Sequence, residues 1–328
     1  MRIVRFGRLG GPEVLQFESV EVAAPDRGQL QIQVKAIGLN RAEALMRAGA
    51  YIQQPSLPAG LGLEAAGVVV QLGEGVDGFV LGEAVSVIPA IDMAEWPTYA
   101  EYINVPVERV VAHPPNLTWE EAAAAWMQYL TAYGALIQVG NLQRGEVVAI
   151  TAASSSVGLA AIQIANAVGA LTVACTREYS KRQALLDAGA AHVIVTDDED
   201  LAIRLKEIAG EEGVKLVLDP IGGPIFEPLT EAMGRGGMLI EYGGLSGQPT
   251  PFPLGMVLGK SLTLRGFLVH EVTGDPQHLA AAKRYIIDGL ANGALRPIIA
   301  QTFPFEQIVE AHRYLESNAQ IGKVVVTI

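Results

Sequence analysis

Hydrophobic and polar residues follow different patterns in different parts of this chain. From Met1 to about Glu121 the apolar runs are short and are separated by turns. Leu30–Ile37 alternates apolar and polar residues, as a half-buried strand does, and Ala66–Leu72 is a β-branched run. Apart from Asn40–Gly49, no pattern of helix length dominates here. This first part is therefore predicted to be β-rich and barrel-like.

A helical pattern from Trp119 to Val139 leads into a second kind of pattern. Thr118 is its predicted N-cap, with Glu120 and Glu121 in the first turn, where the helix dipole favours acids. Beyond it, apolar runs typical of strands alternate with helical segments, which predicts a doubly wound parallel sheet. The six candidate strands are Val147–Thr151, Leu171–Cys175, His192–Thr196, Leu216–Asp219, Gly237–Tyr242 and Leu262–Phe267.

The tail of the chain has a helix over Pro276–Gly289, a helix that ends at Glu316 and a strand over Lys323–Ile328. We expect this tail to return to the first domain. The predicted domains are therefore residues 1–122, completed by residues 268–328, and residues 123–267. The predicted fold class is α/β, a β-rich domain plus a doubly wound parallel sheet.

The first strand, turn, helix and second strand of the sheet form a βαβ unit, which is typical of a dinucleotide site. Against the pattern G-x-G-x-x-G, the glycine positions fall on Ala153, Ser155 and Gly158, so only the last is glycine. Hydroxyl donors can compensate for the missing glycines, and an ordinary βα turn remains the alternative. The predicted phosphate contacts are Ser154, Ser155, Ser156, Val157 and Gly158.

The end of the second strand points to NADPH rather than NADH. An NAD enzyme usually has an acid there, which binds the ribose 2′-hydroxyl. This strand ends instead at Thr176, and Arg177 and Lys181 follow, where a 2′-phosphate would lie. The alternative is that both cations are solvated charges beside a helix, and the neighbouring Glu178 favours that alternative.

Composition and charge exclude several classes of function. The 328 residues carry a net charge of −12, which disfavours binding to nucleic acid or to an anionic membrane. The only cysteine, Cys175, excludes an internal disulfide and indicates a reducing compartment. We find no signal-peptide core and no transmembrane stretch, so we expect a cytoplasmic protein.

Short motifs spread over nearly the whole chain resemble the medium-chain dehydrogenases/reductases, and among them the zinc-free quinone oxidoreductases of the zeta-crystallin type. The motifs are Gly38–Arg41, Met46–Tyr51, Gly62–Val69, Gly73–Val85, Tyr99–Tyr102, Leu130–Tyr133, Ala188–Ala190, Tyr242–Gly247 and Gly322–Val324. The resemblance implies a GroES-like domain, a Rossmann domain and an interdomain cleft for NADPH. It also implies a homodimer that pairs the edge strand Leu262–Phe267 of two copies.

Zinc-dependent members of that superfamily have a catalytic Cys and His, and this chain has Asn40 and Leu63 at the matching positions. Zinc sites need nitrogen, sulfur or carboxylate ligands, so we predict that no zinc is bound. Without a Lewis acid, the acceptors that suit the site are quinones and α,β-unsaturated carbonyls, because they need little activation.

The resemblance also implies roles for residues outside the phosphate turn. Asn40 and Tyr51 match positions that flank the nicotinamide, so they are the predicted catalytic residues. For Asn40 a helix N-cap is the alternative or an additional role, and for Tyr51 the alternative is loop packing. Further predicted cofactor contacts, beside Asn40, are Thr131, Gly243, Gly244, Leu245, Ser246, Phe267, Leu268 and Lys323, the last with a solvated C-terminal charge as its alternative.

Two other functions remain open at this point. An enoyl thioester reductase would share the same scaffold. An NADPH-binding structural or regulatory protein with little turnover would also be compatible with these residues.

Overall fold

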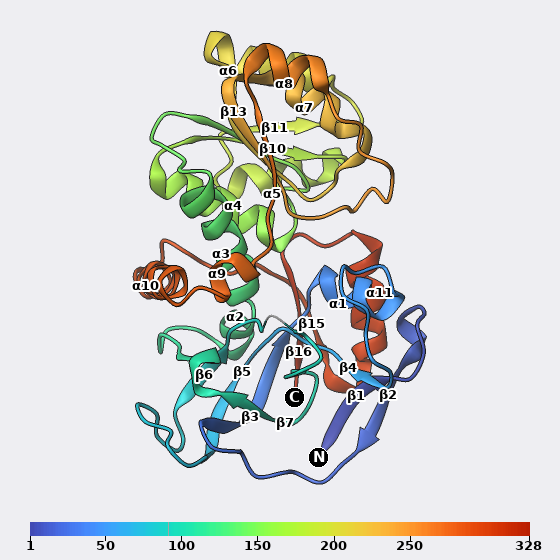
Figure 1. Cartoon of the computed structure of the whole chain (residues 1–328), viewed down its shortest axis with the longest axis vertical. Helices are drawn as coiled ribbons and strands as arrows, with labels where there is room; N and C mark the ends of the chain where they lie inside the picture. The colour runs from blue at the N-terminus through green and yellow to red at the C-terminus, as the bar shows by residue number, and fades with distance from the viewer. Residues whose placement is uncertain (91) are drawn as a thin grey trace. The chain divides into compact units, whose positions relative to one another are not determined.

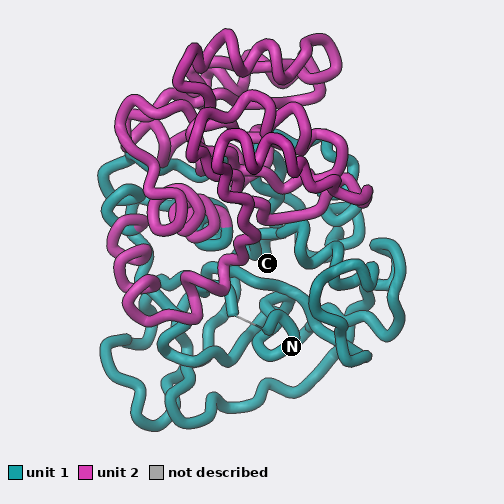
Figure 2. The backbone as a smooth tube through the Cα atoms, turned by 45° about the horizontal axis from the view of Figure 1, so that its top comes forward, with its two compact units in different colours: residues 1–127, 287–328 teal, residues 128–286 magenta. Residues whose placement is uncertain are grey.

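The computed structural model describes residues 1–90 and 92–328. Its backbone forms two compact units, residues 1–127 with 287–328 and residues 128–286 (Figure 2). We call them unit 1 and unit 2. Two helices carry the chain from one unit to the other, α3 (Trp126–Tyr133) and α10 (Pro276–Asn292). The division into units follows contacts within the backbone. The domain boundaries predicted from the sequence, at 122/123 and 267/268, stay a prediction.

Unit 1 is built on a mostly antiparallel sheet around the long strand β3 (Gln29–Gly38) (Figure 1). Among the described residues the strand order is β15-β16-β3-β5-β6-β8, with β7 also paired to β3. The other strands are β5 (Glu64–Leu72), β6 (Ala84–Val87), β7 (Tyr102–Pro106), β8 (Val110–Ala112), β15 (Ile299–Pro304) and β16 (Lys323–Thr327). A smaller sheet has the order β2-β1-β4, formed by Leu15–Ser19, Arg2–Phe6 and Ala59–Gly60.

The C-terminal segment is part of the main sheet of unit 1. Strand β16 pairs antiparallel with β3, and Val325 lies opposite Gly38. This pairing places Lys323, the first residue of β16, beside the end of β3 and the start of α1 (Arg41–Ala48). Helix α11 (Ile308–Ser317) precedes β16 and packs against α1.

Unit 2 holds a parallel sheet with the order β11-β10-β9-β12-β13-β14 among its described residues. Every neighbouring pair is parallel, and the order reverses direction at β9, so the predicted doubly wound sheet and the α/β fold class are confirmed. The strands are β9 (Val147–Ile150), β10 (Leu171–Thr176), β11 (His192–Val195), β12 (Val214–Asp219), β13 (Met233–Glu241) and β14 (Thr263–Gly266).

Helices cover the sheet because its strands carry apolar side chains on both faces. One core contains Val173, Val217 and Leu239 from the strands together with residues of the helices α6, α7 and α8. Helix α4 packs against β9 and β10. The α-helices that lie wholly within unit 2 are α4 (Ser156–Val168), α5 (Arg182–Asp187), α6 (Leu201–Ala209), α7 (Phe226–Ala232), α8 (Leu254–Lys260) and α9 (His270–Thr273).

The helix predicted over Trp119–Val139 is divided in the structure. Thr118 is its N-cap as expected, since its hydroxyl accepts from the Glu121 amide at 3.2 Å. However, α2 (Trp119–Ala123) ends before α3 begins, and α3 is followed by a π-helical segment, Gly134–Val139. The Glu64 carboxylate accepts from the Met127 amide at 2.9 Å and so satisfies one of the free amides in the first turn of α3. This long-range contact explains how two helices form within one helical pattern.

In the described part of the chain, no helix has both the length and the apolar character needed to cross a membrane.

Candidate functional site

The predicted cofactor contacts that follow the strands of unit 2 gather at one edge of its sheet. Parallel strands end at the same edge, so the segments that follow them are neighbours. Ser154–Ser156 follows β9, Thr176 and Arg177 end or follow β10, and Gly243–Ser246 follows β13. The structure therefore brings these three predicted segments together at the carboxyl edge.

The turn after β9 explains why glycine occurs only at its last predicted position. The Ser155 hydroxyl caps α4 by accepting from the Gly158 amide at 3.1 Å. A Cβ at Gly158 would lie 2.5 Å from the Ala153 carbonyl oxygen, so no larger residue fits there. A hydroxyl that accepts one bond can still donate another. The first turn of α4, with Ser156 and Val157, thus offers amides and hydroxyls to an anion, as helix N-termini do.

Arg177 and Lys181 differ in their exposure. The Arg177 side chain is exposed, whereas Lys181 is 7% exposed and its ammonium lies 3.8 Å from the Glu178 carboxylate. Burial lowers the pKa of Lys181. Of the two cations, Arg177 is therefore the one that can reach a ligand phosphate without a change in packing.

The loops after β12 and β13 are joined by backbone hydrogen bonds. The amides of Leu245 and Ser246 donate to Pro220 and Ile221, each at 2.9 Å. A Cβ at Gly243 would lie 2.7 Å from the Pro220 carbonyl oxygen, while one at Gly244 would meet no atom within 4 Å. Gly243 is thus needed for packing, and Gly244 leaves open space at the edge.

Two carboxyl groups that the sequence analysis did not single out lie beneath these loops. Asp219 accepts from the Thr151 hydroxyl and from the amides of Ile221 and Gly222, at 3.2 and 2.9 Å. Glu241 is opposite Asp219 on the next strand, and its buried carboxyl oxygens accept no hydrogen bond of ordinary geometry from described residues. Burial, together with the Asp219 charge, raises the pKa of Glu241 to about 9. The sequence does contain a signal for these two acids, because each is the last residue of a strand and directly follows an apolar run.

Thr131, Phe267 and Leu268 also belong to unit 2. Thr131 is buried in α3, and Phe267 is buried against Gly134, where a Cβ would lie 2.6 Å from its ring. Leu268 is 39% exposed. Packing accounts for Phe267, and the exposed Leu268 is available to a ligand.

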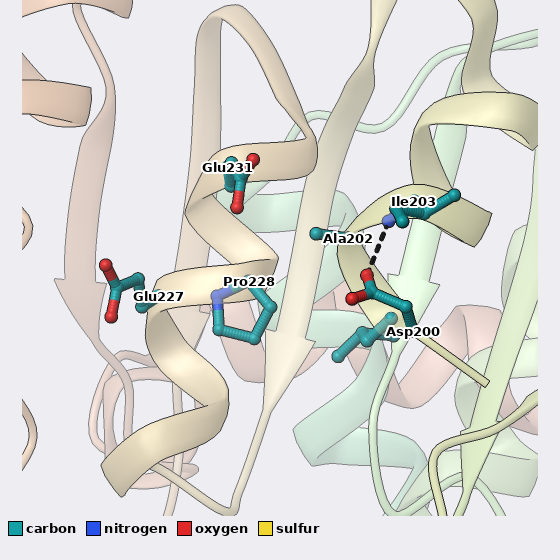
Figure 3. A pocket seen from close by; sticks show the side chains of 7 residues that line it. Asp200, Ala202, Ile203, Glu227, Pro228 and Glu231 are labelled. Carbon is teal, nitrogen blue, oxygen red and sulfur yellow. Dashed lines mark hydrogen bonds between the residues drawn. The ribbon is translucent and has the colours of Figure 1, made fainter. Parts of the chain in front are cut away.

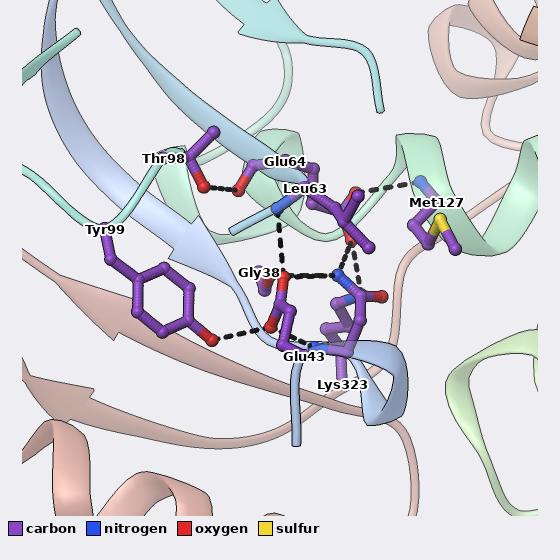
Figure 4. A network of polar contacts seen from close by, with 9 residues as sticks. Gly38, Glu43, Leu63, Glu64, Thr98, Tyr99, Met127 and Lys323 are labelled. Atoms are coloured by element: carbon purple, nitrogen blue, oxygen red, sulfur yellow. Dashed lines mark hydrogen bonds and ion pairs between the residues drawn. The ribbon is translucent and has the colours of Figure 1, made fainter. Parts of the chain in front are cut away.

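Two of the predicted residues of unit 1, Asn40 and Lys323, belong to a buried polar network, much of which Figure 4 shows. Asn40 occupies the N-cap position of α1 and forms a capping box with Glu43, whose carboxylate accepts from the Asn40 backbone amide. The Asn40 side-chain amide donates to Gly38, Glu43 and Glu64 at 3.2–3.3 Å. The Lys323 ammonium donates to the Asn40 side-chain oxygen at 2.7 Å and to Glu64. These contacts set the orientation of the Asn40 amide.

Lys323 is 1% exposed and is ion-paired with Glu64. The alternative interpretation of Lys323 as a solvated C-terminal charge is therefore wrong. Its role toward a cofactor stays a prediction.

Glu43 is the centre of the network, and the sequence analysis did not identify it. Its carboxylate accepts from the Tyr99 hydroxyl at 2.6 Å, the Asn40 backbone amide at 2.8 Å and the Leu63 amide at 3.0 Å. Burial raises the pKa of Glu43 to about 7 in spite of these bonds. Glu43 is the third residue of an amphipathic helix, and an acid at that position does not by itself indicate that its side chain is buried.

Tyr51 is half-buried and packs against the core of unit 1. Burial and the Glu43 charge raise the pKa of Tyr51, so its phenol is protonated at neutral pH and can donate a hydrogen bond. The packing alternative and the catalytic role are both compatible with this position.

The residues at the position of a catalytic zinc do not fit that ion. Leu63 has no donor atom, and the Asn40 side chain is already bonded to Gly38, Glu43, Glu64 and Lys323. Within residues 1–90 and 92–328, no three His, Cys, Asp or Glu side chains are placed to hold a metal.

A separate hollow of about 460 Å³ lies beside α6 and α7 (Figure 3). Its lining includes three carboxylates, from Asp200, Glu227 and Glu231. Such a lining disfavours the phosphates of a dinucleotide, so we do not place the cofactor there.

Comparisons with known proteins agree with this geometry. The alcohol dehydrogenase GroES-like domain family matches residues 26–115, and the zinc-binding dehydrogenase family matches residues 188–326. Quinone oxidoreductase 1 of Escherichia coli is 32% identical over 97% of both chains. The human synaptic vesicle membrane protein VAT-1 homolog is 31% identical over 96% of this chain and 84% of its own length.

Solved structures match over the full length as well. Escherichia coli quinone oxidoreductase in complex with NADPH matches with a TM-score of 0.92 and 32% identity, covering 100% of both chains. The CurK enoyl reductase matches with a TM-score of 0.89 and 26% identity, covering 99% of this chain and 98% of its own. The chain therefore belongs to the quinone oxidoreductase family of the medium-chain dehydrogenases/reductases.

Proposed function

We propose that this protein is an NADPH-dependent oxidoreductase that transfers hydride to a quinone or a conjugated carbonyl without zinc. The observation that carries the proposal is the carboxyl edge of unit 2. It gathers three segments predicted to contact the cofactor on a fold that matches an NADPH-bound quinone oxidoreductase over its full length.

The residues of unit 2 fit the parts of NADPH. The amides and hydroxyls of Ser154–Gly158 at the N-terminus of α4 would hold the diphosphate. The exposed Arg177 would hold the 2′-phosphate, with Lys181 as a more distant charge. Gly243–Ser246, Thr131, Phe267 and Leu268 would contact the nicotinamide half. When bound, NADPH supplies the hydride.

The residues of unit 1 would act on the acceptor. Reduction of a quinone takes up one hydride and one proton, and the product is a hydroquinone. Tyr51 keeps its phenolic proton at neutral pH and would donate a hydrogen bond to the acceptor oxygen, while solvent can supply the proton. Asn40, with its amide already bonded, and Lys323 would orient the site. Most of the rate would come from holding the acceptor against the nicotinamide.

A homodimer is part of the proposal. Strand β14 is the last in the sheet order of unit 2, and a sheet edge is prone to pair with another chain. The neighbouring segment exposes Phe252, Leu254 and Leu258 at 64%, 58% and 72%. Such a patch favours contact with a second copy. Light scattering at micromolar concentration would then give the mass of two chains, and the mass of one chain contradicts this part.

We also propose a cytoplasmic location. It rests on the single cysteine of the sequence, Cys175, which is free and buried. Burial raises the pKa of that thiol to about 12, so it stays unreactive. With a net charge of −12, we propose no nucleic-acid partner and no membrane partner.

The test is the steady-state oxidation of NADPH with 1,4-benzoquinone, an acyclic enone and an enoyl-CoA thioester. We expect turnover with the quinone and weaker turnover with the enone. Preference for the enoyl thioester would favour the second candidate, an enoyl reductase, which the CurK match supports. NADPH binding without turnover of any acceptor would favour a structural or regulatory role.

A further inference from the structure

A row of buried side chains leads from the surface of unit 1 to Glu43. The Arg47 guanidinium contacts the partly exposed Glu316 carboxylate at 2.7 Å and His312 Nδ1 at 2.8 Å. His312 Nε2 lies 3.0 Å from the Tyr99 hydroxyl, which in turn lies 2.6 Å from Glu43 Oε2. Arg47, His312, Tyr99 and Glu43 are each 0% exposed. The row therefore connects α1, α11 and the segment before β7 behind the candidate site.

The direction of every hydrogen bond in this row follows from Arg47. A guanidinium only donates, so His312 Nδ1 accepts and its Nε2 carries the hydrogen. Nε2–H then donates to the Tyr99 oxygen, and the Tyr99 O–H donates to Glu43. Burial lowers the pKa of His312 to about 3, and the Arg47 charge contributes to this, so the ring stays neutral. All donors in the row thus point toward Glu43.

Glu43 receives four hydrogen bonds from the described residues and makes none as a donor. Oε2 accepts from Tyr99 and from the Asn40 backbone amide, and Oε1 accepts from the Leu63 amide and the Asn40 side-chain amide at 3.3 Å. A proton on either oxygen would meet a donor instead of an acceptor. The network is therefore arranged for the ionised carboxylate.

The groups that face Glu43 come from several elements. Tyr99, Asn40 and the positive charge of Lys323 favour its ionised form, and burial opposes it. The negative charge of Glu43 also raises the pKa of Tyr51. Glu64, which accepts from the Asn40 side chain, is ion-paired with Lys323.

We propose that the row Arg47–His312–Tyr99 positions Glu43, and that Glu43 as a carboxylate holds Asn40 and, through it, Lys323 in the geometry used for hydride transfer. This inference rests on the proposed function. None of the three residues of the row touches the reacting atoms, so they are positioning residues. Their effect on the reaction should appear as a shift of its pH profile.

The inference predicts opposite pH trends for turnover and stability. Protonation of Glu43 below about pH 7 removes the charge that holds Asn40, so turnover falls in acid. The pKa of Glu43 is higher in the folded protein than its ordinary value of 4.5, so the folded state binds more protons between these values. The contribution of Glu43 to stability is therefore full below pH 4.5 and is lost as the pH rises through about 7.

The experiment compares Tyr99→Phe with the wild type. The kcat/KM for NADPH with 1,4-benzoquinone is measured between about pH 5 and pH 9. We expect an acid limb near pH 7 in the wild type, and Tyr99→Phe should move it upward by about one pH unit, because a donor to the carboxylate is lost. Tyr102→Phe is the matched control. It removes a hydroxyl bonded to Gln33 in the same unit, at 3.2 Å, and should leave the limb in place.

Two more variants separate positioning from a merely structural effect. His312→Gln keeps an N–H donor and an acceptor without titrating, so the limb should stay near the wild-type pH. Glu43→Gln should abolish the limb, and the difference in melting temperature between it and the wild type should change between about pH 5 and pH 8. This measurement also applies if Tyr99→Phe does not fold.

The outcomes are distinct. Turnover in the wild type with an unmoved limb in folded Tyr99→Phe, or with a normal limb in Glu43→Gln, contradicts the inference alone. Absence of turnover in the wild type with every acceptor contradicts the proposed function, and with it the catalytic meaning of the row.

Discussion

Each unit contains a buried carboxyl group close to its candidate site, and the two groups have opposite surroundings. Glu43 in unit 1 accepts four hydrogen bonds, and the pKa of Glu43 is about 7. Glu241 in unit 2 accepts none of ordinary geometry from described residues and lies beside Asp219, and the pKa of Glu241 is about 9. Burial acts on both groups in the same direction. The hydrogen-bond donors and the neighbouring charge therefore decide which one ionises at neutral pH.

This difference matches what each unit is proposed to do. In unit 1, an ionised Glu43 is needed to hold Asn40. In unit 2, Asp219 accepts hydrogen bonds from the amides of Ile221 and Gly222. A protonated Glu241 therefore adds no second negative charge beneath the edge that would bind a diphosphate. Four predictions test this division of roles, two of them with a second variant for comparison, and they follow from the largest expected effect to the smallest.

Glu43→Leu should cause the largest loss of stability. It leaves the Tyr99 hydroxyl and the amides of Asn40 and Leu63 without their acceptor, at a cost of roughly 3–5 kcal/mol in the free energy of unfolding. Urea unfolding measures this loss. Glu241→Leu is the matched control and should change stability by only about 1 kcal/mol at neutral pH, because the Glu241 carboxyl oxygens accept no hydrogen bond of ordinary geometry from described residues. Equal losses in both variants would mean that burial alone, and not bonding, distinguishes the two acids.

Arg177→Ala tests whether the Arg177 side chain of unit 2 binds the 2′-phosphate of NADPH. A charge-assisted contact contributes about 1.5–3 kcal/mol, so NADPH affinity should fall roughly tenfold or more while NADH affinity changes little. Lys181→Ala should have a smaller effect, because that side chain is buried near Glu178. Isothermal titration with both cofactors decides the matter, and an equal loss for NADH speaks against the assignment.

Glu241→Gln tests the protonated state of the acid in unit 2. The pKa of Glu241 is raised in the folded protein, so its contribution to stability is lost as the pH rises through about 9. The amide cannot ionise, so the variant should gain on the wild type by roughly 1–2 kcal/mol between neutral pH and pH 10, allowing for solvent screening. Thermal melts over this range show the gain. A constant difference between the two proteins would show that Glu241 is already ionised.

Tyr51→Phe should have the smallest effect, on turnover and not on stability. The phenol donates a hydrogen bond, and solvent can replace its proton, so the cost in kcat should be about tenfold or less. Stopped-flow kinetics with 1,4-benzoquinone measures it. A loss of several thousandfold would make Tyr51 an obligatory acid and would overturn the proposed division of roles.

The sequence by itself determined the elements and much of their order. Alternation and β-branched runs predicted the β-rich region and the parallel sheet, and the structure confirms both as parts of an α/β fold. Short-range chemistry was also readable, such as the Thr118 cap and the glycine at position 158, where a Cβ would strike the preceding turn. These features depend on residues that are close in the chain, so the local pattern contains them.

Only the tertiary structure decided which distant side chains meet. Arg47 and Glu316 are 269 residues apart in the chain, and Asn40 and Lys323 are 283 apart. The pairing of β16 with β3 and the packing of α11 on α1 bring them together. The same kind of contact, between Glu64 and the Met127 amide, satisfies a free amide at the point where the predicted helix is divided. Sheet register and helix packing are collective properties of the whole core, so no local pattern of polar and apolar residues shows a buried network of this kind.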